Sequence, residues 1–364
     1  MNPLLRSFAC GLLWWCLLAQ PTASETIEYP AVTPGHLLHF PADEGSHPEF
    51  RTEWWYVTGW LEDETGIGRG FQVTFFRSRP GTVERNPSAF AAKQLLFAHA
   101  ALSDPRRGRL LRDERAAREG FGLAAARVGD LNVFIDNWSL RSQGAALGYR
   151  ATVVSQEFEL DLQLRPSQPP LLQGAGGFSQ KQPDARFASH YYSLPQLEVA
   201  GRLVQDRRVH RVRGSAWLDH EWSSSIMAED ARGWDWVGLN LADGGALMAF
   251  QMRDTQGRRQ WAAATWRASG QPEVRTYRPD EIQWQPLRRW RSPRTGVEYP
   301  VAWRVRVAQR TFVLQPLMDD QENDARGSTG TLYWEGAVRA VDEGGRTLGR
   351  GYLELTGYAS PVRF

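Results

Sequence analysis

Apolar and polar side chains alternate at every second residue in segment after segment of this chain, which is the period of a strand. In residues 157–165, Phe158 and three leucines fall on one face of an extended strand, while charged or amide side chains occupy the other. Residues 301–307 repeat the pattern, with valine and tryptophan alternating against alanine and arginine. Such segments predict half-buried antiparallel strands with one face toward solvent.

Turn signals separate the expected strands at short intervals, as in residues 243–245, 254–257 and 342–345. The one alanine-rich stretch, residues 115–127, contains two glycines that each cost about 1 kcal/mol in a helix, so a loop or a poor helix is expected. Residues 166–184 are rich in Pro, Gly, Gln and Ser and are expected to form a long surface loop. Many short antiparallel strands predict an all-β protein of closed barrels or sandwiches, because closure removes exposed strand edges.

The first 24 residues have the pattern of a secretory signal peptide. Arg6 precedes an apolar run over residues 8–19, and small residues follow before Glu25. This run is shorter than the roughly 20 residues of a permanent membrane helix, and no later stretch is longer and as apolar. We therefore expect cleavage and export, with the periplasm as the destination and no integral membrane span. Retention of the segment as an anchor is the alternative.

The amino-acid composition further restricts the kinds of protein to which this chain can belong. Both cysteines, Cys10 and Cys16, lie in the signal, so the mature protein would have no disulfides and no thiolate ligands. The formal charge is +2, and the arginines are interleaved with acids, which argues against a nucleic-acid partner. The length of the mature chain favours two domains, each large enough to bury a core.

Proton-handling side chains are concentrated in residues 214–238, among four tryptophans. Such groups are costly to desolvate unless they pair, so their concentration indicates catalysis, a binding site or a hydrogen-bonded turn. The candidate catalytic residues are Asp219, His220 and Asp235, and the candidate ligand-binding residues beside them are Trp222, Trp234 and Trp236.

Six motifs occur in a characteristic order: EWWYVTG (53–59), GFQVTFFR (70–77), FAHAALSD (97–104), YYS (191–193), WLDHEW (217–222) and WDW (234–236). This set resembles the carotenoid hydratase (hydroxyneurosporene synthase) and AttH-like family, to which fungal pericyclases are also similar. The resemblance implies two lipocalin-like β-barrels side by side, here residues 25–225 and 226–364. It also implies an apolar cavity in or between the barrels for a long or polycyclic hydrophobic molecule. The motif positions that match are Asp219, His220, Trp234, Asp235 and Trp236.

In the hydratases of this family, water captures a protonated alkene. A carboxylic acid with a pKa raised by burial could donate the proton, and tryptophan faces could stabilise the cation. His220 or a second carboxylate could then deprotonate the water. The export signal departs from the carotenoid hydratases, whose substrate is dissolved in the membrane of a pigment pathway. In the purely structural alternative, Asp219 caps a turn and His220 satisfies a buried carbonyl.

Further candidate ligand-binding residues lie on other expected strands: Glu53, Trp55, Tyr56, His99 and Tyr192. Glu53 either anchors the closure of a barrel or lines a cavity, and His99 is either a satisfied core residue or a pocket residue. Strand alternation places Tyr191 and Tyr192 on opposite faces.

No metal and no cofactor are expected. Adjacent residues on a strand point to opposite faces, so Asp219, His220 and Glu221 cannot converge on one ion, and no His-Glu-x-x-His helix exists. The sequence thus predicts an exported protein that binds a hydrophobic lipid-like or polyene-like molecule, with acid-assisted hydration or isomerisation as its enzymatic form. The alternatives are a non-catalytic carrier or accessory protein of an envelope lipid or export system, and a carbohydrate-binding protein with an open groove.

Overall fold

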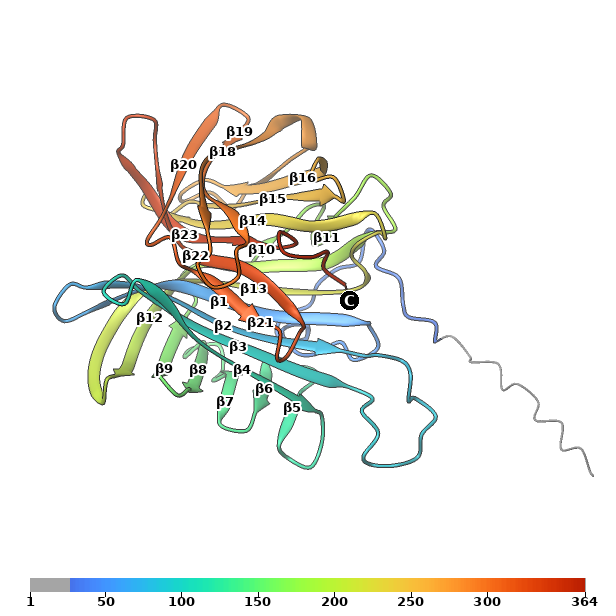
Figure 1. Cartoon of the computed structure of the whole chain (residues 1–364). Coiled ribbons are helices and arrows are strands. Elements are labelled where there is room, and N and C mark those ends of the chain that lie inside the picture. Colours follow the sequence, from blue (N-terminus) through green and yellow to red (C-terminus); the bar gives the residue numbers. More distant parts are fainter. Residues whose placement is uncertain (1–26, 364) are drawn as a thin grey trace, which may run out of the picture.

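The computed structural model describes residues 27–363 and is almost entirely β structure, which confirms the predicted fold class (Figure 1). Two short 3-10 helices, η1 (Ala42–Glu44) and η2 (Pro279–Glu281), are the helical elements of these residues. The predicted signal peptide lies outside the described residues. No helix within residues 27–363 is long and apolar enough to cross a membrane.

The first sheet contains thirteen antiparallel strands. They are β1 (Thr52–Asp63), β2 (Gly68–Ser78), β3 (Leu95–Asp104), β4 (Arg109–Arg118), β5 (Ala124–Ala126), β6 (Asn132–Ile135), β7 (Trp138–Ser142), β8 (Tyr149–Val154), β9 (Phe158–Arg165), β10 (Leu171–Leu172), β11 (Phe178–Gln180), β12 (Ala188–Gln205) and β13 (Arg208–Ser225). Their order is β4-β3-β2-β1-β13-β12-β9-β8-β7-β6-β5, and β10 and β11 add to β12.

The second sheet contains ten antiparallel strands. They are β14 (Ala231–Leu241), β15 (Ala246–Asp254), β16 (Arg259–Arg267), β17 (Val274–Tyr277), β18 (Ile282–Arg291), β19 (Glu298–Val307), β20 (Arg310–Pro316), β21 (Glu322–Ala325), β22 (Thr331–Val341) and β23 (Thr347–Leu355). Their order is β17-β16-β15-β14-β23-β22-β20-β19-β18, with β21 on β22.

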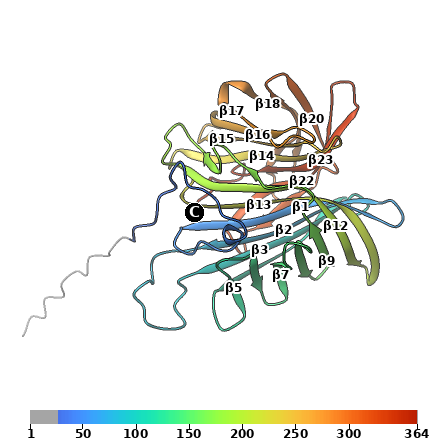
Figure 2. The same cartoon turned by 180° about the vertical axis from the view of Figure 1, so that it is seen from behind.

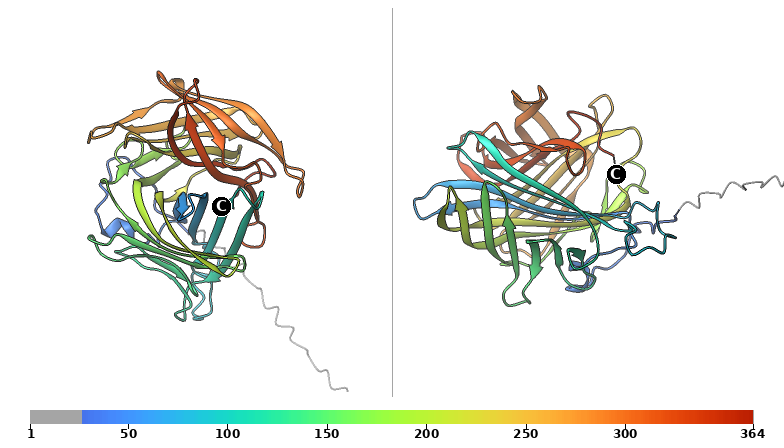
Figure 3. Two further views of the ribbon diagram at one scale, coloured as in Figure 1. Left: turned by 90° about the vertical axis from the view of Figure 1, so that its left-hand side faces the viewer. Right: turned by 60° about the horizontal axis from the view of Figure 1, so that its bottom comes forward.

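Each sheet curves around its own apolar interior (Figure 3). In the first barrel, the guanidinium of Arg115 on β4 donates to the carbonyl oxygen of Ile135 at 3.2 Å and lies 4.7 Å from the ring centroid of Trp138. In the second, Arg259 donates to the carbonyl oxygen of Ile282 at 2.6 Å. The first bond links β4 to β6 and the second links β16 to β18, so each connects strands at or next to the opposite ends of its sheet.

Two sequence expectations differ from the structure in detail. Residues 115–118 continue strand β4, because that segment pairs with Leu95–Ala98 of β3 and gains a full hydrogen-bond ladder. Residues 166–184, expected to be a surface loop, contain β10 and β11, and Lys181 in this segment is buried.

The two barrels pack through the outer faces of β1, β12 and β13 on one side and β14, β15, β22 and β23 on the other (Figures 1 and 2). Tyr56, Trp217 and Trp236 belong to this contact, and Trp60 donates its indole N–H to the carbonyl oxygen of Gly351 at 3.1 Å. The central strands of both sheets are therefore buried on both faces. Polar side chains on their outer faces lie between the domains and not in solvent.

Candidate functional site

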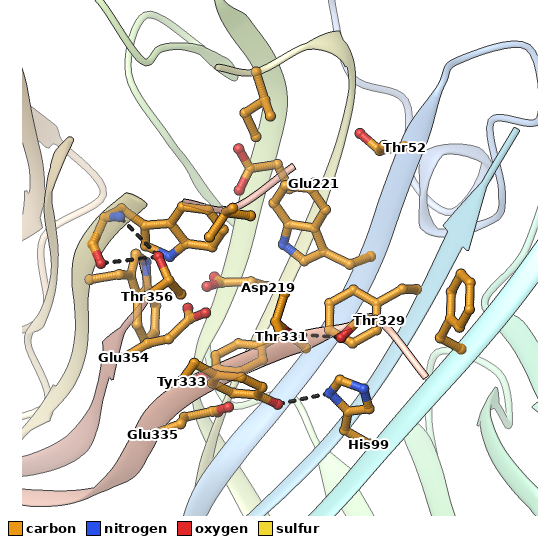
Figure 4. Close-up of a pocket in the computed structure, with 18 of the residues that line it drawn as sticks. Thr52, His99, Asp219, Glu221, Thr329, Thr331, Tyr333, Glu335, Glu354 and Thr356 are labelled. Carbon is orange, nitrogen blue, oxygen red and sulfur yellow. Dashed lines mark hydrogen bonds between the residues drawn. The ribbon is translucent and has the colours of Figure 1, made fainter. Parts of the chain in front are cut away.

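A cavity of about 320 Å³ lies between the two barrels (Figure 4). Aromatic and aliphatic side chains from both sheets make up much of its wall: Trp54, Tyr56, Phe76, Phe97, Trp234, Trp236, Phe250 and Met252. A mainly apolar wall with a few polar groups is the usual composition of a small-molecule site, and the volume is within the range of such sites.

Strand alternation on β13 decides which polar groups reach this cavity. Asp219 and Glu221 line it, whereas His220 and Trp222 between and beyond them face the interior of the first barrel. The two members of the predicted Asp219–His220 pair therefore lie on opposite sides of one strand. On β12, alternation likewise sends Tyr191 to the cavity and Tyr192 to the first barrel.

Asp219 accepts hydrogen bonds from three side chains of the first domain. The Tyr191 hydroxyl donates at 2.8 Å and the Trp217 indole at 2.6 Å, and Ser193 also donates. Burial raises the pKa of Asp219 to about 7, although these donors favour the carboxylate and offset part of the shift. Asp219 can thus exchange a proton near neutral pH.

Two further carboxyl groups reach the cavity from the second domain. Glu335 on β22 stands directly opposite Glu354 on β23, so both side chains project from the same face of the sheet. Figure 4 shows Glu354 next to Asp219, with Glu335 nearby. Among the ion pairs of the described residues, none involves Glu335 or Glu354, and the neighbouring Tyr56 hydroxyl is the group that favours the charged form of Glu335.

This pair holds protons more tightly than ordinary glutamates. Burial raises the pKa of Glu335 well above its usual range, and the facing Glu354 adds to the shift. Burial also raises the pKa of Glu354 to about 8, with Asp219 and Glu221 adding to the shift and a hydrogen bond from Trp234 opposing it. Because two facing carboxyl groups in a buried site cannot both ionise cheaply, the pair retains at least one proton at neutral pH.

The fourth carboxylate at the cavity, Glu221, has a counter-ion. Lys181 lies 2.6 Å from it, and Ser189 donates a hydrogen bond to the same oxygen. The Lys181 ammonium also lies 4.7 Å from the ring centroids of Tyr191 and Phe250. Glu221 and Lys181 therefore form a neutral ion pair at the wall of the cavity. The carboxyl groups there without a basic partner are those of Asp219, Glu335 and Glu354.

His99 lies on the opposite part of the wall, on β3. Its Nδ1 is 2.8 Å from the Tyr333 hydroxyl and its Nε2 is 2.9 Å from the Ser328 hydroxyl, so both nitrogens are satisfied. Burial lowers its pKa to about 3, and Arg112 adds to the shift, so the ring is neutral. His99 is a hydrogen-bonding part of the wall and not a proton donor.

The structure divides the residues singled out in the sequence into two groups. Those whose side chains reach the cavity are Asp219, Trp234, Trp236, Tyr56 and His99; those directed into a barrel are His220, Trp222, Trp55, Tyr192 and Asp235. Glu53 borders the cavity, but its carboxylate contacts Arg77 and two histidines inside the first barrel.

Asp235 has a full set of partners in the second barrel. Its carboxylate pairs with Arg253 at 3.1 Å and accepts hydrogen bonds from Gln251 at 2.7 Å and the Tyr358 hydroxyl at 2.8 Å. A carboxylate held by a cation and two donors stabilises the end of a barrel, and it has no access to a ligand in the interdomain cavity.

Sequence reasoning missed Glu335, Glu354 and Lys181. In the sequence, Glu335 and Glu354 occupy alternate positions that an isolated strand would turn toward water, and nothing local distinguishes them from exposed glutamates. Only the docking of the second barrel on the first buries them.

Several solved protein structures are similar to this chain. A Nitrosomonas europaea protein named as an AttH is 48% identical, with a TM-score of 0.85, over 92% of this chain and 100% of that one. Kievitone hydratase from Nectria haematococca is 14% identical over 93% of this chain and 98% of its own, with a TM-score of 0.67. CghA with Sch210972 is 15% identical over 86% of this chain and 90% of its own, with a TM-score of 0.54.

The last two similarities show a shared fold alone. No curated protein matches the sequence. The AttH-like family model matches residues 31–358, which is nearly the whole described chain and includes all six motifs. The resemblance found in the sequence is therefore confirmed, and the chain belongs to the AttH-like family.

Proposed function

We propose that the protein binds a long apolar alkene in the interdomain cavity and catalyses its hydration or isomerisation. The observation that carries this proposal is the facing pair Glu335–Glu354, buried without a cation beside Asp219 in an aromatic cavity. Burying like charges opposite each other destabilises a sheet, so a purely structural role does not account for the pair.

In the hydration, the protonated member of the Glu335–Glu354 pair donates its proton to one alkene carbon, and the other carbon becomes a cation. The faces of Trp54, Trp234 and Trp236 stabilise that cation, because ring quadrupoles attract positive charge. A water molecule attacks the cationic carbon, forms the new C–O bond and gives a proton to the carboxylate of Asp219. In isomerisation, the same base removes a proton from an adjacent carbon instead.

The positions of donor and acceptor support this division of roles. Glu335 and Glu354 come from the second domain and Asp219 comes from the first, so the proton donor and the proton acceptor belong to different domains and face the same cavity. Burial raises the pKa values of all three carboxyl groups, so a proton is available at the cavity near neutral pH. A structural neighbour that is named a hydratase makes this chemistry compatible with the fold.

Export remains part of the proposal on the strength of the amino-terminal sequence pattern. The substrate would then be an apolar molecule of the cell envelope or its surroundings. In the rival function, the protein is a carrier, and a specific observation favours it, namely the extensive apolar wall of the cavity. A carrier would bind the molecule and release it unchanged.

The test uses a panel of apolar alkenes, namely farnesol, squalene, retinol and lycopene, incubated with the protein in ¹⁸O-labelled water. We expect ¹⁸O to enter at least one of them, detected by mass spectrometry. Glu335→Gln and Asp219→Asn should each lower the rate by about 100-fold or more, as expected for loss of a general acid or base. The exposed Glu273→Gln is the control and should retain full activity.

Binding without ¹⁸O incorporation or double-bond migration in any panel member would favour the carrier. In that case, Glu335→Gln would leave the affinity unchanged or would increase it. Failure to bind any of the four alkenes would contradict both functions.

A further inference from the structure

A second cluster of ionisable groups lies inside the mouth of the first barrel, on the opposite face of β13 from Asp219. It contains His47, which follows η1, Glu53 on β1 and His220 on β13. The distance from Glu53 Oε1 to His47 Nδ1 is 2.8 Å, and the distance from the same oxygen to His220 Nε2 is 3.0 Å. All three ligand-type atoms lie within 4.8 Å of one another.

The other nitrogen of each histidine faces an oxygen acceptor. His47 Nε2 lies 3.3 Å from a carboxylate oxygen of Asp43, and His220 Nδ1 lies 3.0 Å from the backbone carbonyl oxygen of Asp43. The Tyr192 hydroxyl, 3.3 Å from His220 Nδ1, completes its surroundings. When each ring carries its proton on the outer nitrogen, both inner nitrogens present a lone pair to Glu53. Without an ion, despite burial, the hydrogen bonds with Asp43 and Glu53 raise the pKa of His47 to about 9, so that ring carries a proton on both nitrogens.

Glu53 is held in a fixed orientation by its second oxygen. Oε2 accepts hydrogen bonds from Arg77 Nε at 2.8 Å and from the Ser46 hydroxyl at 2.9 Å, and the backbone N–H of His47 donates to the same carboxylate. Oε1 is thereby directed at the two imidazoles. Such outer-shell bonds to a carboxylate and to each histidine are typical of metal ligands in proteins.

Two imidazole lone pairs and a carboxylate oxygen that converge on one point repel each other unless positive charge lies between them. Either extra protons on the rings or one metal ion can supply that charge. We propose that His47, Glu53 and His220 bind one divalent transition-metal ion of the zinc class. Two histidines and one carboxylate are a common ligand set for zinc. Its usual bond length of about 2.0–2.1 Å requires ligand atoms no more than about 4 Å apart, so the two imidazole nitrogens, now within 4.8 Å of each other, would close in around the ion.

The proposed site is independent of the alkene chemistry in the interdomain cavity. It differs from the set Asp219, His220 and Glu221, which cannot converge on one ion because those residues are adjacent on one strand. The ligands of the proposed site come from three separate segments. A bound ion ties the segment around η1 to β1 and β13, and three protein ligands leave a fourth position for water. The 13% exposed side chain of His47 gives the ion a route from solvent.

The experiment uses the full mature protein after treatment with a chelator, titrated with Zn²⁺ and, separately, with Co²⁺ as a spectroscopic probe. The wild type should bind one ion per chain, develop the visible absorption of low-coordinate Co²⁺ and melt at a higher temperature with Zn²⁺. His47→Ala and His220→Ala should abolish the one-ion stoichiometry. Asp43→Asn, which alters only an outer partner, should weaken binding by about 10–100-fold.

His210→Ala is the matched control, because His210 lies elsewhere on β13 and should leave binding unchanged. Should the histidine variants fail to fold, X-ray absorption at the zinc edge of the wild type decides the question, with only nitrogen and oxygen ligands, including two imidazoles, expected. A wild type that binds no ion, a zinc edge without imidazole, or folded variants that bind as well as the wild type would each overturn the proposal.

Discussion

Replacing Glu354 by glutamine is expected to remove a substantial part of the stability loss that the wild type should show between about pH 5 and pH 8, a loss that it shares with Glu335 and Asp219. The folded pKa of Glu354, about 8, lies above the ordinary glutamate value of 4.5. Between these values the unfolded chain has released the proton while the folded protein keeps it, so stability falls as pH rises. The full loss for this fully buried group is on the order of several kcal/mol, since each unit of difference corresponds to about 1.4 kcal/mol.

Urea unfolding at about pH 5, pH 7 and pH 8.5 measures this effect. Glu354→Gln should flatten the slope, and Glu335→Gln should act in the same direction because it removes the facing charge. The exposed Glu273→Gln should keep the wild-type slope. A wild type equally stable at pH 5 and pH 8.5 would show that the two glutamates are ionised and solvated, and the proposed acid would be lost.

Truncating Trp236 to alanine is expected to destabilise the protein by about 3–5 kcal/mol, the usual cost of removing a buried tryptophan side chain. Trp236 is 7% exposed and lies at the centre of the contact between the barrels. It packs edge-on against Tyr56 and Trp217, with centroid distances of 5.4 and 6.4 Å, and donates to the Tyr191 hydroxyl at 3.1 Å. The change therefore opens the interface and removes a donor from the hydroxyl that orients Asp219.

Calorimetry distinguishes this interface effect from a general loss of core. Trp236→Ala should lower the unfolding temperature and separate one cooperative transition into two, because the barrels lose a shared contact. The matched variant Trp290→Ala, in a half-buried position on β18 of the second barrel, should lower stability less and leave a single transition. A Trp236→Ala protein as stable as the wild type would mean that the barrels do not depend on this contact.

Much of the fold could be predicted from the sequence because the alternation of apolar and polar side chains along a strand is a local property. The pattern in residues 157–165 shows which face of β9 is buried without knowledge of its neighbours, and the structure buries Phe158, Leu160 and Leu162. Lys181 escaped prediction for the opposite reason. Its surroundings in the sequence are those of a loop, and only the pairing of β11 with β12 and the contact with Glu221 bury it.

The site could be predicted only in part. Asp219 and Trp236 stand in motifs that mark them. Adjacency in the sequence groups Asp219 with His220, but strand alternation places their side chains on opposite faces. Glu335 and Glu354 become a pair through the register of β22 with β23, and they meet Asp219 through the packing of two domains. Neither the register nor the domain packing is encoded in any short stretch of sequence.

An apolar ligand in the cavity between the barrels is the premise of the proposed function. Titration with the fluorescent polyene cis-parinaric acid tests it, with Thr331→Trp filling the cavity and Thr276→Trp adding the same bulk on the exposed strand β17. One polyene should bind per wild-type chain and per Thr276→Trp chain, with binding lost in Thr331→Trp. Unchanged binding by a folded Thr331→Trp protein would place the ligand elsewhere and contradict the account.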